Sequence, residues 1–129
     1  SPINHISPKD FNKIININIT ANWHLIRSFD PLLRLSKYGR AYFLICKQKT
    51  YNEPYFGAYS LTSSSIESMI KNWQQEIKKS NIKVNTFDPG PILSNLRQNS
   101  FPGENTDKLN TAENAAYKFV SLLEKSYKN

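Results

Sequence analysis

Residues 40–46 form the run Arg-Ala-Tyr-Phe-Leu-Ile-Cys, which is almost continuously apolar and has the length of a strand. Such runs are typical of parallel strands that are covered on both faces. Residues 82–87, Ile-Lys-Val-Asn-Thr-Phe, form a second segment with β-branched and aromatic side chains. Between them, apolar residues from Tyr59 to Ile77 advance by steps of three and four, which predicts a helix over about 57–80. The sequence therefore predicts a parallel strand-helix-strand unit over about 40–87, with a right-handed crossover.

An amphipathic helix is predicted to precede this unit, over about residues 8–30. Ser7 can cap it, Pro8 suits its first position, and Asp10 complements the positive end of its dipole. Apolar side chains then recur every three or four residues as far as Asp30-Pro31, where we expect the helix to end.

A long loop and a last helix are predicted to follow the second strand. Residues 88–110 are interrupted by proline and glycine, and their length suggests a lid or a substrate loop. Thr111, with Glu113 in the first turn, predicts a final helix over about 111–125. The expected fold is α/β, a partial Rossmann-like parallel sheet flanked by helices, within one incomplete domain spanning 1–129.

The composition favours a cytoplasmic globular protein. The chain has 129 residues, 39% of them hydrophobic and 21% charged, which suits one domain with a modest core. No apolar stretch is long enough for a bilayer, and no secretory leader is visible. The single cysteine, Cys46, fits a reducing compartment. His5 and His24 lack partners at metal-ligand spacing, so no metal site is predicted. Because the chain begins with Ser1, we expect upstream sequence to be missing.

The net charge of +7 raises the hypothesis of nucleic-acid binding. The lysines, however, are scattered singly or in pairs, and no base-stacking motif, zinc-finger spacing or recognition-helix signature is present. A solvated basic surface is the favoured interpretation, and a nucleic-acid-binding domain remains the less favoured alternative.

The predicted topology brings three polar or turn-forming features to one edge of the sheet. Cys46 ends the first strand, Tyr59 lies in the first turn of the connecting helix, and Pro89-Gly90 follows the second strand. Ligands of open parallel sheets bind at the carboxyl ends of the strands. We therefore expect Cys46, Tyr59 and Pro89-Gly90 to converge there.

The order of several short motifs resembles the short-chain dehydrogenase/reductase family over nearly the whole chain. The motifs are Ile17-Asn18-Ile19-Thr20-Ala21, Gly57-Ala58-Tyr59-Ser60, Asp88-Pro89-Gly90-Pro91-Ile92 and Phe101-Pro102-Gly103-Glu104. The resemblance implies a carboxyl-terminal, catalytic half whose amino-terminal dinucleotide-binding half is missing. It also implies hydride transfer between an alcohol or carbonyl substrate and NAD or NADP.

By this resemblance Tyr59 is the acid-base residue and Asn18 is the helix asparagine. The family has a serine thirteen residues before the tyrosine and a lysine four residues after it; this chain has Cys46 and Ser63 there. An unperturbed tyrosine titrates at about 10, so loss of the nearby lysine makes the phenol a poor base at neutral pH. Lys47 or Lys49 on the following loop is a possible substitute cation.

The glycine-rich turn that approaches the cofactor pyrophosphate in the family is absent. The four glycines, Gly39, Gly57, Gly90 and Gly103, do not have its spacing. The resemblance leaves only nicotinamide-end contacts, from Pro89, Gly90, Ile92 and Ser94. We therefore expect that this chain alone does not bind NAD or NADP.

Two parallel strands bury little apolar surface and leave open edges, so a partner is expected. The candidates are the missing amino-terminal half and a second copy, the latter through the helices over about 8–30 and 57–80. The sequence thus predicts a fragment of an NAD(P)-dependent short-chain oxidoreductase that is inactive alone. The alternative is a catalytically inactive interaction or dimerisation module.

Overall fold

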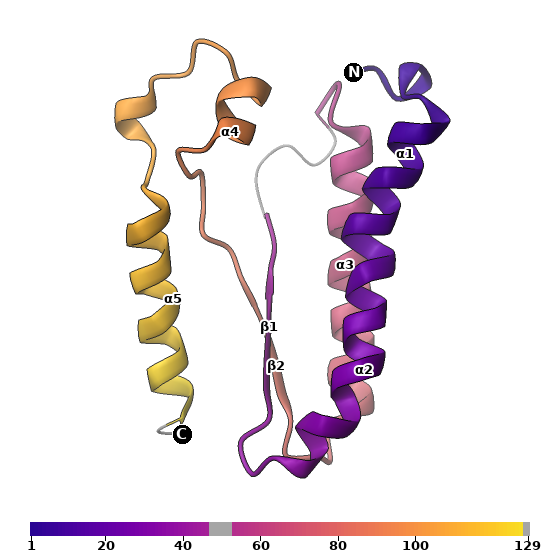
Figure 1. The fold of residues 1–129 in the computed structure, drawn as a ribbon, viewed down its shortest axis with the longest axis vertical. Helices are drawn as coiled ribbons and strands as arrows, with labels where there is room; N and C mark the ends of the chain where they lie inside the picture. Colours follow the sequence, from indigo (N-terminus) through magenta and orange to yellow (C-terminus); the bar gives the residue numbers. More distant parts are fainter. Residues whose placement is uncertain (47–52, 128–129) are drawn as a thin grey trace. The chain divides into compact units, whose positions relative to one another are not determined.

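A computed structural model describes residues 1–46 and 53–127 of the chain. It consists of two compact units, Ser1–Thr86 and Phe87–Asn129. Strands β1 (Arg40–Leu44) and β2 (Lys83–Phe87) form a two-stranded parallel sheet, and α3 (Gly57–Glu76) lies between them in the sequence (Figure 1). The α/β class and the strand-helix-strand order are therefore confirmed.

The boundaries of this unit are slightly narrower than predicted. Strand β1 ends at Leu44 rather than at residue 46, although Ile45 beyond it is still buried in the core. Helix α3 ends at Glu76 rather than near residue 80, and β2 begins at Lys83. These small shifts leave the predicted connection unchanged.

The amino-terminal segment is one long helical rod built from three pieces. A short 3₁₀ turn (Ile3–His5) comes first, then α1 (Pro8–Ile15), a π-helical turn η2 (Asn16–Thr20) and α2 (Ala21–Leu35). The hydroxyl oxygen of Ser7 accepts a hydrogen bond from the Asp10 amide at 3.1 Å, which confirms the predicted cap.

The predicted helix end at Asp30-Pro31 was wrong, because α2 continues to Leu35. A proline inside a helix removes one N–H donor and disfavours its continuation. Here Arg34 Nε donates to the Asp30 carboxylate at 2.6 Å and ties the turn before Pro31 to the turn after it. Leu33, beyond the proline, also packs against the hydrophobic core.

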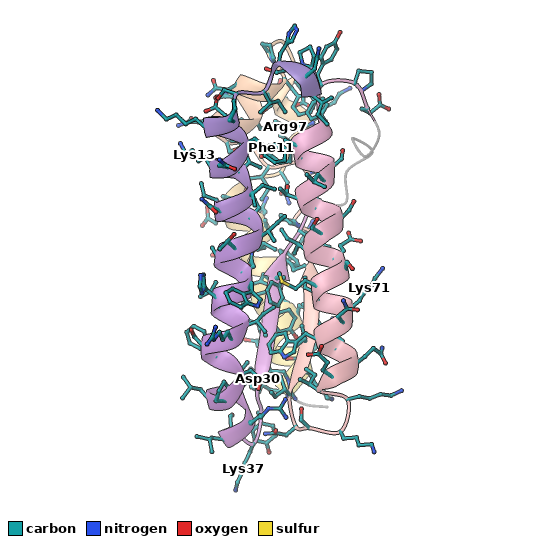
Figure 2. All side chains as sticks on the ribbon, turned by 90° about the vertical axis from the view of Figure 1, so that its right-hand side faces the viewer. Phe11, Lys13, Asp30, Lys37, Lys71 and Arg97 are labelled. Carbon is teal, nitrogen blue, oxygen red and sulfur yellow. The ribbon has the colours of Figure 1, made fainter. Side chains whose placement is uncertain are left out.

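The core of the first unit lies between the sheet and the two helical rods. Figure 2 shows the α1–α2 rod lying alongside α3, with the strands behind them. The buried core residues are Ile45, Ile66, Ile70, Trp73, Ile77, Ile82 and Val84. Trp73, only 5% exposed, donates its indole N–H to the Asp30 carboxylate at 2.8 Å and thereby links α3 to α2.

The second unit contains more regular structure than the predicted loop over 88–110. It includes α4 (Asn95–Ser100), a 3₁₀ turn (Thr106–Lys108) and a parallel bridge between Ile92 and Asn110. The last helix, α5 (Ala112–Tyr127), confirms the predicted helix over about 111–125. The Thr111 hydroxyl accepts from the Asn114 amide at 3.1 Å, as expected of a cap.

Within residues 1–46 and 53–127, none of the helices has the length and apolar character needed to cross a bilayer. The same described ranges contain no group of three or more histidine, cysteine, aspartate or glutamate residues arranged to hold a metal ion.

Candidate functional site

Tyr59 lies in the first turn of α3, on a backbone that is held firmly while its ring stays accessible. The Thr62 hydroxyl, on a residue only 3% exposed, donates to the Tyr59 carbonyl at 3.1 Å. At the helix start, a β-carbon on Gly57 would lie 2.9 Å from the Ile3 side chain, so the 3₁₀ turn packs closely there. Tyr59 itself is 47% exposed. The helix therefore fixes the phenol at an open position.

A cavity of about 330 Å³ adjoins this phenol. Tyr59 shares its lining with the polar residues His5, Ser7 and Asp10 at the start of the amino-terminal rod. The volume lies at the small end of the range of about 300–1,000 Å³ for small-molecule sites. The candidate acid-base residue therefore faces a space of substrate size.

Ser63 follows Tyr59 by one helical turn and is half-buried. Residues four apart on a helix are neighbours on its surface, so this is where a cation would act on the phenol. A serine hydroxyl carries no charge and cannot fill that role. The substitute cations considered above, Lys47 and Lys49, lie outside the described residues.

Asn18 lies in the π turn η2, in the middle of the amino-terminal rod. Its side-chain amide donates to the Ile14 carbonyl at 3.0 Å, and its own carbonyl accepts from the Asn22 side chain at 2.6 Å. The turn packs against α3, the helix that carries Tyr59 and Ser63. Single-turn π insertions are rare and frequent at functional sites. The structure thus brings the Asn18 turn and the Tyr59 helix together.

Asn22 is a functional candidate that the sequence argument missed. It holds the Asn18 carbonyl, and it belongs to no motif that the resemblance uses. The available signal was its spacing of four residues from Asn18, which places both amides on one helix face.

Cys46 lies just beyond the carboxyl end of β1, half-buried and with a free thiol. This agrees with its predicted place at the end of the strand. Its convergence with Tyr59 stays a prediction.

The four predicted nicotinamide-end residues lie in the second unit, in a hydrogen-bonded turn. Gly90 has a φ of +72°, and its amide donates to the Asp88 carboxylate at 2.8 Å. Ile92 forms the bridge with Asn110, and the Ser94 hydroxyl caps α4 by accepting from the Arg97 amide at 3.1 Å. Pro89 is half-buried beside Gly90. Each position therefore has a structural role, and its role toward a cofactor stays a prediction, as does the meeting of this turn with Tyr59 and Cys46.

The residues present do not fit a complete dinucleotide. A pyrophosphate cradle needs closely spaced glycines whose backbone approaches the phosphates at a helix start. The two glycines with positive φ, Gly90 and Gly103, lie thirteen positions apart and have open space where a β-carbon would stand. A phosphate cradle is therefore absent from this sequence, and only nicotinamide-end contacts remain to be considered.

A second feature that sequence reasoning missed fixes the loop after α4. Arg97 donates two hydrogen bonds to the Glu104 carboxylate, each at 2.7 Å, and its guanidinium lies 3.8 Å from the centre of the Phe101 ring. The hydrogen bonds from Arg97 lower the pKa of Glu104, against a smaller opposing effect of desolvation. A cavity of about 200 Å³ lies beside this clamp. Opposite charges on the two sides of Pro102-Gly103 were the available signal.

Comparison with known proteins agrees with these local features. The family described as short chain dehydrogenase matches residues 1–105. The chain is 26% identical over 110 residues to the uncharacterized oxidoreductase YciK of Escherichia coli, a match that covers 85% of this chain and 43% of that protein. It is 30% identical over 108 residues to the 3-oxoacyl-acyl-carrier-protein reductase FabG of Rickettsia conorii, covering 84% of this chain and 41% of FabG.

Solved structures show the same relationship. A short chain dehydrogenase from Shigella flexneri, complexed with NADP, superimposes with a TM-score of 0.78 at 26% identity, covering 85% of this chain and 46% of that one. The chain thus spans less than half the length of these relatives. With its strand-helix-strand sheet, the tyrosine that opens the crossover helix, and a family match over residues 1–105, the chain belongs to the short chain dehydrogenase family.

Proposed function

We propose that this chain is the substrate-side half of an NAD(P)-dependent short-chain oxidoreductase and acts only with a separate dinucleotide-binding half. The observation that supports this most directly is the position of Tyr59, which opens α3 beside a cavity of about 330 Å³. The packing of the Asn18 turn against the same helix supports it as well. Relatives described as reductases, and a relative solved with NADP, supply the reaction class.

In this proposal the chain orients a carbonyl or alcohol substrate and exchanges a proton with it at the Tyr59 hydroxyl. Cys46 takes the place of a serine and polarises the substrate oxygen less, because a thiol is a weaker hydrogen-bond donor. Ser63 leaves the phenol without the cation that would favour its ionised form. Both replacements lower the expected rate, so the substrate-side half is a slow catalyst even when complete.

The cofactor belongs to the other half. This sequence lacks a phosphate cradle, and the turn from Pro89 to Ser94 is the part that would lie at the nicotinamide end. When bound, NAD or NADP supplies the hydride acceptor or donor. We assign the chain to the cytoplasm, since its single cysteine suits a reducing compartment.

Calorimetry with NADPH tests the proposal in two steps. The purified chain alone is expected to show no micromolar binding, whereas the chain mixed with a dinucleotide-binding fragment is expected to bind NADPH and to reduce short-chain aldehydes slowly. Micromolar NADPH binding by the chain alone would contradict the division into halves.

A matched pair of variants tests the role of the phenol. Tyr59→Phe is expected to abolish the slow reductase activity of the assembled protein, because it removes the only group placed to exchange the proton. Tyr117→Phe, on the exposed part of α5, is the control and is expected to change nothing. Equal rates for the two variants would remove Tyr59 from the proposed chemistry.

A further inference from the structure

The sheet of the first unit has one edge that no strand covers within the described parts of the chain. Its strand order is β1-β2, so β2 occupies one side of β1 and the opposite side lacks a strand neighbour. The main-chain groups of an edge strand are a template for a further extended segment. Any occupant of this edge is therefore expected to bind in the extended conformation.

An apolar groove adjoins this strand. A cavity of about 430 Å³ lies between α2 and β1, with Trp73 of α3 at its base, and its lining is mainly aliphatic and aromatic. Leu25 and Phe29 line it from α2, and Leu44 lines it from β1. Leu44 is 70% exposed, although it is part of a strand that enters the core of the unit. A strand edge next to a groove of this character fits a segment that is extended and apolar on at least one face.

We propose that the outer edge of β1 and this groove bind an apolar extended segment of the dinucleotide-binding half, added as a third strand parallel to β1. This proposal rests on the proposed function, which divides the enzyme into two halves. The chain covers 46% of the Shigella structure, so more than half of such a protein lies outside the matched part and can supply the segment. Strand β1 offers five residues for the pairing, which is close to the usual strand length of about 5–6.

The parallel direction favours this occupant over a second copy of the chain. The sheet present is parallel, and purely parallel sheets are over-represented among known folds. Two copies of β1 paired across a twofold axis would run antiparallel and would give a mixed sheet instead. A separate segment avoids this, and its apolar side chains would fill the groove along α2.

The test uses the full chain and, as its probe, the fragment of Escherichia coli YciK that lies outside the matched segment. Binding is measured by calorimetry for the natural chain and for Phe29→Glu and Leu44→Lys, which put a charge at each wall of the groove. Leu35→Glu is the matched control, because it lies on the same helix, is 85% exposed and does not line the groove. All three positions are exposed, so the variants are expected to keep the helical circular dichroism of the natural chain.

The natural chain and Leu35→Glu are expected to bind the YciK fragment alike. Each groove variant is expected to bind at least about tenfold more weakly, because it would bury an uncompensated charge. Hydrogen exchange of amides in residues 40–44 is expected to slow in the complex, as a newly paired strand requires.

Three results would overturn the inference. The first is equal binding by the groove variants and the control. The second is no binding of the YciK fragment at all. The third is self-association of the chain that Phe29→Glu abolishes, which would give the groove to a second copy. Groove-dependent binding without any NADPH binding by the complex would support this inference and refute the proposed function, so the two failures are distinguishable.

Discussion

Replacing Ser63 by lysine tests whether this position is where a cation would act on Tyr59. The two residues are one turn apart on α3, and side chains at this spacing have β-carbons about 5–6 Å apart. The new ammonium group is therefore expected to lie about 6 Å from the phenolic oxygen.

The size of the effect follows from Coulomb's law. A unit charge at about 6 Å stabilises the phenolate by about 3 kcal/mol at an effective dielectric constant of about 20, and by about 0.7 kcal/mol in bulk water. Tyr59 is about half exposed, so an intermediate value of about 1–2 kcal/mol is appropriate. Because a factor of ten corresponds to about 1.4 kcal/mol, the phenolate fraction at a given pH should rise about 5- to 30-fold.

The assay is an alkaline titration followed by the near-ultraviolet absorbance of phenolate, with Tyr59→Phe as the background for the other tyrosines. Ser64→Lys adds the same charge at the next position, which is exposed and lies about 100° further round the helix. We expect Ser63→Lys to shift the titration toward lower pH and Ser64→Lys to shift it much less. Equal shifts would mean that position 63 does not face the phenol, and the argument from its missing lysine would then fail.

Three further predictions concern the contacts that hold the two units in shape. Trp73→Phe removes the indole donor to Asp30 and is expected to lower the free energy of unfolding by about 1.5–3 kcal/mol, as for other hydrogen bonds to charged groups, measured by urea denaturation at neutral pH. The Arg34 hydrogen bond lowers the pKa of Asp30, so its stabilisation is present above the unfolded value of about 3.9 and is lost as the pH falls through the folded value. Asp30→Asn should therefore flatten the loss of stability in acid, and an unchanged acid profile would contradict this. In the second unit, Glu104→Gln breaks the ion pair with Arg97 and is expected to speed chymotryptic cleavage between residues 97 and 104 severalfold near neutral pH; the same cleavage of the natural chain should rise only in acid, as Glu104 becomes protonated.

Local signals in the sequence were sufficient for the strands, the crossover helix and the caps. Ser7 and Thr111 cap helices because their hydroxyls accept from amides three residues later, an interaction that needs no distant partner. The apolar run over 40–46 likewise identified β1, since a strand buried on both faces requires such a run. The motif around Tyr59 placed this residue at a helix start, where the structure has it.

Contacts between distant residues decided what no local pattern contained. Helix α2 passes Pro31 because Asp30 binds both Arg34 and Trp73, and the tryptophan is 43 residues away in the sequence. The π turn at Asn18 likewise packs against α3, whose first residue is Gly57. Periodicity reports only which side chains share a face, whereas a helix that continues through a proline depends on which neighbour satisfies the groups that face presents.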